Sequence, residues 1–129
     1  MKVNLPITHE EIAFPTGRYL VSKTDQRGVI THANAAFIEL SGFSREELIG
    51  QSHNLVRHPD MPPEAFQDLW QTLQAGLPWH GLVKNRCKNG DYYWVKAFVV
   101  PIRKDGRVTG YMSVRTEPGR DEVRDAHAL

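Results

Sequence analysis

The sequence predicts an α+β domain, in which a five-stranded antiparallel sheet carries helices on one face. Two observations support this prediction. Three glycine-containing turns separate runs rich in β-branched and aromatic residues, whereas the central segment, 34–76, has the capping residues and apolar spacing of helices. The order is therefore two strands, then helices, then three strands. The early strands can join the late ones in a single sheet only if the helices cross over its face.

Three turns define the expected strands. Asn89-Gly90 and Asp105-Gly106 are the strongest hairpin signals, because a type I′ turn needs two residues at positive φ. A third turn, Asp25–Gly28, interrupts the first β-rich stretch in the same way. We expect antiparallel pairing within the early group and within the late group. The turns separate 19–24 from 29–32, 82–86 from 92–95, and 97–102 from 108–112.

Capping residues define two short helices in the central segment. Asn34 is expected to cap a helix over 35–41, because a side-chain oxygen at this position accepts a bond from a free backbone N–H. Ser44 and Glu47 then form a capping box, the pattern of a serine followed three residues later by a glutamate. Gly50 ends this second helix.

The longest helix is expected to begin at Pro62-Pro63 and to end at Gly76. Proline suits the first turn, where its missing N–H costs nothing. Apolar residues recur along this helix at i, i+3, i+4 and i+7, so we expect it to lay one apolar stripe onto the sheet. The stripe consists of Phe66, Leu69, Trp70 and Leu73.

Length, charge and cysteine content narrow the function classes. The 129 residues suit one domain, and 16 basic residues against 15 acidic ones leave no electrostatic footprint for nucleic acid or anionic lipid. The single cysteine, Cys87, excludes an internal disulfide framework and is expected to be a buried, inert side chain. No run approaches the roughly 18 apolar residues of a membrane span. Without a secretory signal, we expect a cytoplasmic location.

The chain divides into three parts. Residues 1–18 form an N-terminal arm with two prolines, and residues 19–116 hold the expected strands and helices. Residues 117–129 lack a β pattern and carry mixed charge, which indicates a linker or the start of an exit helix. A chain that ends in this way is expected to be part of a larger protein.

The densest polar cluster lies in the loop before the long helix. It contains His53, Arg57, His58 and Asp60. Arginine offers a planar fork suited to phosphate, and aspartate can bond a ribose hydroxyl. The alternative is a surface loop in which Asp60 merely caps the helix. A zinc site is disfavoured because the two histidines are not spaced i, i+4, whereas haem bound by either histidine stays open.

Three residues outside that loop are further candidates for contact with a planar ligand. Trp70 belongs to the helix stripe, where packing is the default interpretation, and Trp79 follows a turn, where stacking and packing are equally plausible. Asn85 lies mid-strand on the inward face, by alternation, and must find hydrogen-bond partners on a neighbour or on a ligand. Catalytic motifs are missing from the sequence, so we expect no enzyme.

Two groups of motifs occur along the chain. The general ones are Ile30–Asn34 with Phe37 and the run 41–51, and the more specific ones are Ser52–Pro62, Trp79-x-Gly81, Val83–Arg86, Lys88–Trp94 and Gly110–Thr116. Together these motifs resemble those of PAS domains, and more specifically the N-terminal sensor of aerotaxis transducers in the methyl-accepting chemotaxis protein family. The likeness covers about residues 19–116.

The resemblance implies a PAS fold with noncovalent FAD between helices and sheet. The domain would read redox state or oxygen through the flavin and relay it to a downstream signalling domain of the parent receptor, with a PAS homodimer as a further expectation. Cys87 lacks the sequence context of light-oxygen-voltage domains, so no photochemical adduct is expected. By motif, Arg57, His58, Asp60 and Trp79 match positions that hold FAD, and Asn34 and Asn85 match positions near the ligand or the signalling route; His53 and Trp70 complete the candidate cofactor contacts.

Alternatives from other classes remain at this point. A cofactor-free PAS module would dimerise or bind partners through the sheet face and the arm. A flavin oxidoreductase would need an open path for substrate and a poised acid or base. Only two observations favour FAD over FMN as the cofactor: the reach of Arg57 to a diphosphate, and the family likeness.

Overall fold

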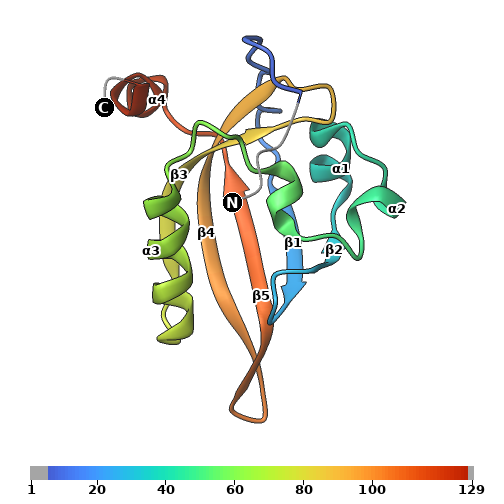
Figure 1. Ribbon diagram of the computed structural model, residues 1–129, viewed down its shortest axis with the longest axis vertical. Helices are drawn as coiled ribbons and strands as arrows, with labels where there is room; N and C mark the ends of the chain where they lie inside the picture. Colours follow the sequence, from blue (N-terminus) through green and yellow to red (C-terminus); the bar gives the residue numbers. More distant parts are fainter. Residues whose placement is uncertain (1–5, 128–129) are drawn as a thin grey trace.

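Five antiparallel strands form one sheet in the order β2-β1-β5-β4-β3 (Figure 1). The structure is a computed structural model that describes residues 6–127. The first strand of the chain lies beside the last, so the early and late strands share one sheet, as the sequence predicts. The strands are β1 (Leu20–Asp25), β2 (Ile30–Ala33), β3 (Trp79–Arg86), β4 (Tyr92–Lys104) and β5 (Arg107–Thr116).

The two C-terminal hairpins differ in their turns. Asp105 and Gly106 both have positive φ, at 52° and 78°, as a type I′ turn requires. At Asn89-Gly90 only the glycine has positive φ, so the expectation of a type I′ turn is wrong there. The Cys87 N–H donates to the Asp91 carbonyl and the Gly90 N–H donates to the Cys87 carbonyl, so these two bonds close a longer turn instead.

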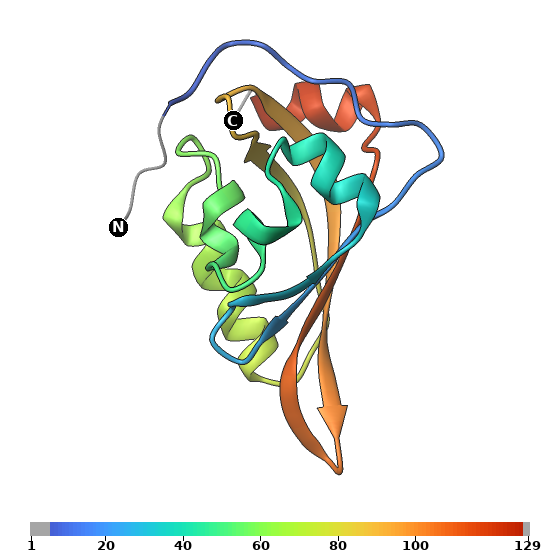
Figure 2. The same ribbon diagram turned by 90° about the vertical axis from the view of Figure 1, so that its right-hand side faces the viewer.

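The helices between the early and late strands cover one face of the sheet (Figure 2). The predicted caps are confirmed: Asn34 Oδ1 accepts from the Phe37 N–H, and Ser44 and Glu47 form a reciprocal capping box. Asp60 is not a cap, because the residue at the N-cap of the long helix is Pro62. The elements are α1 (Ala35–Ser41), α2 (Arg45–Leu48), the 3₁₀ helix η1 (His53–Val56) and α3 (Pro63–Gln74).

The main core lies between the sheet and the pair α1 and α2. Its buried members include Leu20, Phe37, Leu48, Tyr93 and Val95. Burial of such side chains stabilises the fold by about 2 kcal/mol each. This core occupies one end of the helical layer and leaves α3 to stand separately on the other edge of the sheet (Figure 1).

A final helix, α4 (Arg120–His127), packs elsewhere. Its Val123 is buried against Trp94, which alternates to the opposite face of β4 from Tyr93 and Val95. Glu122 also pairs with Lys96 of β4 at 3.2 Å. The segment after Thr116 is therefore a helix docked on the outer face of the sheet.

The described part of the N-terminal arm, residues 6–18, binds to its own domain. Backbone bonds join Ile12 to Tyr92 at 2.7 Å and Tyr92 to Glu10 at 3.0 Å, and Phe14 is buried in the main core. The arm passes over one end of the sheet in Figure 2. Among residues 6–127, no helix has both the length and the apolar character to cross a bilayer.

Candidate ligand-binding site

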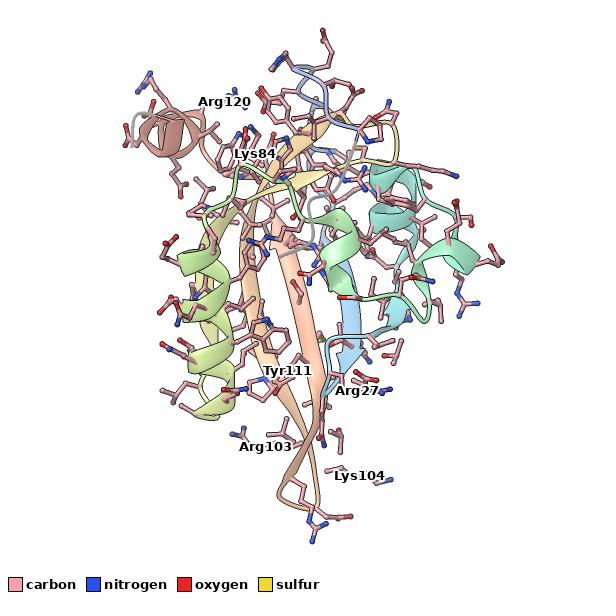
Figure 3. The ribbon with its side chains drawn as sticks, in the orientation of Figure 1. Arg27, Lys84, Arg103, Lys104, Tyr111 and Arg120 are labelled. Carbon is pink, nitrogen blue, oxygen red and sulfur yellow. The ribbon has the colours of Figure 1, made fainter. Side chains whose placement is uncertain are left out.

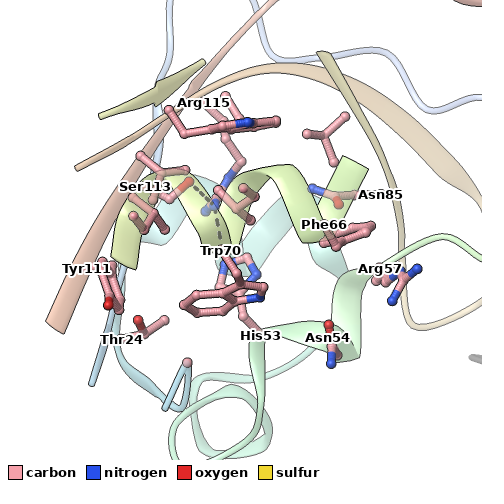
Figure 4. Close-up of a pocket in the computed structure, with 17 residues that line it drawn as sticks. Thr24, His53, Asn54, Arg57, Phe66, Trp70, Asn85, Tyr111, Ser113 and Arg115 are labelled. Atoms are coloured by element: carbon pink, nitrogen blue, oxygen red, sulfur yellow. Dashed lines mark hydrogen bonds between the residues drawn. The ribbon is translucent and has the colours of Figure 1, made fainter. Parts of the chain in front are cut away.

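A cavity lies between α3, η1 and the inward face of the sheet (Figure 4). It holds about 730 Å³ of space outside the protein atoms, with its opening to solvent included. Ligand pockets of this kind are usually mostly apolar with a few convergent polar groups, and the lining follows that pattern.

The helix side of the cavity is the apolar stripe of α3. The sequence predicts that this stripe packs directly on the sheet, but all four of its members line the cavity and only Leu73 is buried. The stripe faces the sheet, as predicted, and still meets other side chains, since Trp70 packs edge to face on Tyr111 and Phe66 lies against the Arg57 guanidinium. The lining residues on this side are Phe66, Leu69, Trp70 and Leu73.

The middle of the sheet side is formed by short side chains. Val83 of β3, Ala97 and Val99 of β4, and Ser113 of β5 contribute to it. Small and β-branched residues on neighbouring strands leave room above the sheet for a planar group. Trp70 closes one end of the cavity, where its ring meets Tyr111 edge to face with centroids 5.5 Å apart.

Trp79 and Gly81 explain a motif that the sequence shows as Trp-x-Gly. A Cβ atom at Gly81 would collide with the indole of Trp79. Glycine is therefore required for the Trp79 ring to lie along its own strand. The ring lines the cavity and its Nε1 donates to Asp68 of α3 at 2.8 Å, so Trp79 ties the helix to the strand.

Asn85 and Arg57 lie together at another side of the cavity. Asn85 is buried on the inward face of β3, as alternation predicts, and its backbone bridges to that of Arg57. The Arg57 guanidinium carbon lies 4.0 Å from the centre of the Phe66 ring. Both residues line the cavity (Figure 4), so the structure brings a buried amide and a partly exposed cation to one ligand space.

His53 belongs to a second polar group, centred on Arg115. Arg115 donates to Ser113 at 2.8 Å and to Ser22 at 3.0 Å, and its Nη1 lies 3.3 Å from His53 Nε2 (Figure 4). Its guanidinium also lies 4.4 Å above the Phe37 ring. Arginine only donates, so His53 Nε2 accepts and the histidine proton sits on Nδ1.

Burial sets the charge states of this group. It lowers the pKa of His53 to about 3, and the charge of Arg115 acts in the same direction, so His53 is neutral at neutral pH. Burial also lowers the pKa of Arg115, to about 10, which leaves the guanidinium charged. Burial raises the pKa of the neighbouring Tyr93, against the opposing effects of Arg115 and Asn85.

The structure places three predicted site residues outside the cavity. Asn34 joins β1 to α1: its Oδ1 accepts from Val21 and Phe37, and its Nδ2 donates to the Tyr19 carbonyl. The other two, His58 and Asp60, lie on the far side of the loop, under the N-terminal arm. The structure therefore gives all three a part in holding the walls rather than in lining the space.

Asp60 and His58 fasten the loop to the edge strand. Asp60 accepts from Lys84 at 2.9 Å, and its backbone N–H donates to His58 Nδ1 at 3.0 Å. Figure 3 shows Lys84 toward the end of the sheet where Arg120 lies, and Tyr111 toward the other end. Since Lys84 immediately precedes Asn85, this ion pair fixes the loop next to the buried amide. Lys84 lowers the pKa of Asp60, and burial lowers the pKa of His58.

Tyr111, Ser113 and Arg115 were not predicted as site residues. They alternate along β5 and all three line the cavity. A signal was present: a serine and an arginine at alternate positions of a strand place polar side chains on the same face as an aromatic. That face is inward, so the polar groups need partners or a ligand.

Two other sequence expectations concern chemistry. Cys87 is buried, and burial raises its pKa to about 11, so it is an inert thiol at neutral pH. Among residues 6–127, no group of three or more His, Cys, Asp or Glu side chains is arranged to hold a metal ion.

The residues of the cavity fit a planar heteroaromatic ring: two apolar walls, a buried amide, and cationic donors.

The chain is similar in sequence to parts of two larger bacterial proteins. The chain is 50% identical over 123 residues to the aerotaxis receptor of Escherichia coli, which covers 95% of this chain and 24% of the receptor. It is 33% identical over 98 residues to a nitrogen fixation regulatory protein of Klebsiella pneumoniae, covering 75% of this chain and 20% of that protein. This chain thus spans about a quarter or less of these relatives.

Solved structures share the fold at low identity. The light-state structure of the blue-light photoreceptor Aureochrome1 LOV matches with a TM-score of 0.74 and 21% identity, over 84% of this chain and 91% of that one. A light-oxygen-voltage domain studied with a flavin analogue matches with a TM-score of 0.73 and 22% identity, over 85% and 83%. The family model described as PAS fold matches residues 30–115. Because that match spans most of the sequence, the chain belongs to the PAS fold family.

Proposed function

We propose that this chain is a sensory PAS domain that binds FAD noncovalently in the cavity and relays the redox state of the flavin to a downstream signalling domain of the parent receptor. The cavity carries this proposal, with its two apolar walls, its buried Asn85 and its cationic groups. The 50% sequence identity to an aerotaxis receptor supports redox or oxygen sensing. The flavin analogue studied in a light-oxygen-voltage domain of the same fold supports a flavin as the ligand.

Arg57 is the residue that favours FAD over FMN. It lines the cavity while remaining partly exposed, and its planar fork can bond a diphosphate. Trp79 supplies a stacking surface between α3 and β3. His58 and Asp60 contribute by holding the loop that carries Arg57 against β3.

Asn85 is proposed as the residue that reads the redox state. Bound flavin supplies a ring whose edge changes from hydrogen-bond acceptor to donor on reduction. The Asn85 amide carries both a donor and an acceptor, so a rotation of the amide answers that change. Asn85 lies on β3, opposite Tyr93 of β4, and the next residue of β4, Trp94, packs on Val123 of α4.

The output would be a shift of α4 on the outer face of the sheet. A free-energy difference of about 1–3 kcal/mol between two arrangements of α4 is enough for a signal. The Lys96–Glu122 pair, the Arg120–Glu11 pair and the Val123 contact attach α4, and such a difference could shift them. A homodimer belongs to this proposal as a second way of transmitting the change.

An enzyme is less well supported. Among the described lining residues no aspartate or glutamate is present, and the pKa of His53, lowered to about 3, leaves it a poor base at neutral pH. General acid–base catalysis needs a group whose pKa lies near the working pH. We therefore propose a sensor without turnover.

The first test is a visible spectrum of the purified protein, followed by denaturation and identification of the released ligand. A two-banded flavin spectrum with FAD in the supernatant supports the proposal. Release of FMN instead would contradict the role of Arg57 in binding a diphosphate. A haem spectrum would overturn it. Colourless protein that stays colourless after refolding with FAD would favour an interaction module, for which the exposed Phe98 on the outer sheet face is the surface to test.

Two variants test the residue roles. Arg57→Ala should lose FAD while the fold is kept, and Arg27→Ala, which removes an exposed arginine outside the cavity, should retain it. In Asn85→Ala, hydrogen exchange of β3, β4 and α4 should no longer differ between oxidised and reduced protein. A wild-type difference in this variant would refute the amide rotation.

A further inference from the structure

The charged side chains that line the cavity all have the same sign. Among the described residues that line it, the charged side chains are Arg57 and Arg115, and none is an aspartate or glutamate. The other titratable side chains in the lining are His53 of η1 and Tyr111 of β5. Tyr93 of β4 faces Arg115 from the sheet. The cavity is thus positive, with one partly exposed and one buried cation.

Arg115 is the more unusual of the two cations. It is 2% exposed and forms no salt bridge within residues 6–127. Its hydrogen-bond partners Ser22, Ser113 and His53 are all neutral, and its Nε has no partner among the described residues. A buried charge of this kind costs several kcal/mol unless an opposite charge compensates it.

The neighbours of Arg115 hold it in place without neutralising it. Ser113 and Ser22 each accept one of its bonds, and Phe37 lies under the guanidinium plane. The Ser22 hydroxyl lies 3.0 Å from His53 Nε2, where the histidine must accept. Three elements, β1, η1 and β5, therefore supply hydrogen bonds that orient one cation at the wall of the cavity. Its charge is left uncompensated and available to a ligand in the cavity.

We propose that Arg115 is the counter-charge of the flavin ring and holds the reduced ring as an anion. This inference rests on the proposed function and adds a residue to it. A flavin that gains two electrons and one proton carries one negative charge, whereas one that gains two electrons and two protons is neutral. A cation in a low-dielectric site favours the first form, because an opposite charge favours ionisation of its neighbour.

The number of protons taken up is therefore the quantity to measure. For a two-electron couple, each proton taken up shifts the midpoint potential by about 30 mV per pH unit. In weakly acidic buffer free FAD takes up two protons and serves as the reference. Dithionite supplies the electrons and water the protons. Wild-type protein should show the slope of a single proton in the same buffers.

Three variants separate charge from structure. Arg115→Met removes the charge and keeps much of the stem, and it should restore the two-proton slope and weaken binding of reduced FAD at least tenfold relative to oxidised FAD. Arg115→Lys keeps the charge and should keep the one-proton slope. The control is Arg86→Met, since Arg86 is also a buried arginine but lies outside the cavity lining; its slope should equal that of wild type.

The outcomes decide the matter even if Arg115→Met does not fold, because the wild-type slope needs no variant. A two-proton slope in wild type would overturn the counter-charge while leaving FAD binding intact. A one-proton slope that persists in Arg115→Met would assign the anion to another group and overturn it too. If no flavin binds to wild type at all, the proposed function fails and the inference falls with it.

Discussion

The rings of Trp70 and Tyr111 meet edge to face with their centroids 5.5 Å apart, and this contact joins α3 to β5 across the end of the cavity. The hydrogen bond from Trp79 of β3 to Asp68, at 2.8 Å, also attaches α3, so the aromatic contact is one of several that hold the helix on the sheet. Edge-to-face aromatic pairs contribute about 1 kcal/mol beyond the area they bury.

We predict that this pair is energetically coupled. A double-mutant cycle of Trp70→Leu and Tyr111→Leu should give an interaction free energy of about 1 kcal/mol in urea unfolding. The matched control is Tyr111→Leu with Val123→Ala, which lies on α4 across the sheet, and these two should be additive. Additivity in the first pair would mean that α3 is held by other contacts.

Asn34 is predicted to act on the structure rather than on the ligand. Its side chain makes three hydrogen bonds, to Val21, Phe37 and the Tyr19 carbonyl. Asn34→Ala should lower the free energy of unfolding by about 2 kcal/mol. Ser44→Ala, which removes a cap with one such bond, should cost about 1 kcal/mol. Loss of ligand from Asn34→Ala without loss of stability would contradict this role.

His53 should make the fold sensitive to acid. Burial lowers its pKa to about 3 from 6.5, so as the pH falls the unfolded chain binds the proton first. Stability is therefore complete above 6.5 and is lost as the pH falls toward 3. Between neutral pH and about pH 5, the free energy of unfolding of wild type should fall. The fall should be about 1–2 kcal/mol smaller in His53→Gln. The exposed His32 offers a control, and His32→Gln should behave as wild type.

Cys87 should resist alkylation in the folded protein. Its thiol donates to the Leu40 carbonyl, and burial raises its pKa to about 11 from 9.0. Since the thiolate is the reactive form, iodoacetamide should modify the native protein far more slowly than the urea-unfolded chain at mildly alkaline pH. Between 9 and 11 the unfolded chain loses the proton first, so stability should fall over that range. Equal rates in both states would contradict the burial.

Much of the local structure follows from short-range sequence patterns. Asn34 and the pair Ser44 and Glu47 cap helices because their side chains bond backbone groups within three residues, and Asp105-Gly106 turns the chain through two positive φ angles. Such interactions need no distant partner, so a sequence pattern suffices to predict them. The motif around Arg57, Trp79 and Asn85 also placed three of the cavity residues.

What the inward faces of helices and strands meet depends on the tertiary structure. The stripe of α3 faces the sheet and also lines a cavity, because periodicity encodes which face of a helix is apolar and not how tightly that face packs. Arg115 becomes part of the site because β5 lies beside β1 and brings Ser22 within hydrogen-bond distance. His58 and Asp60 fall outside the cavity because their loop turns them toward Lys84. These positions depend on contacts between residues far apart in the chain, and the local sequence does not specify such contacts.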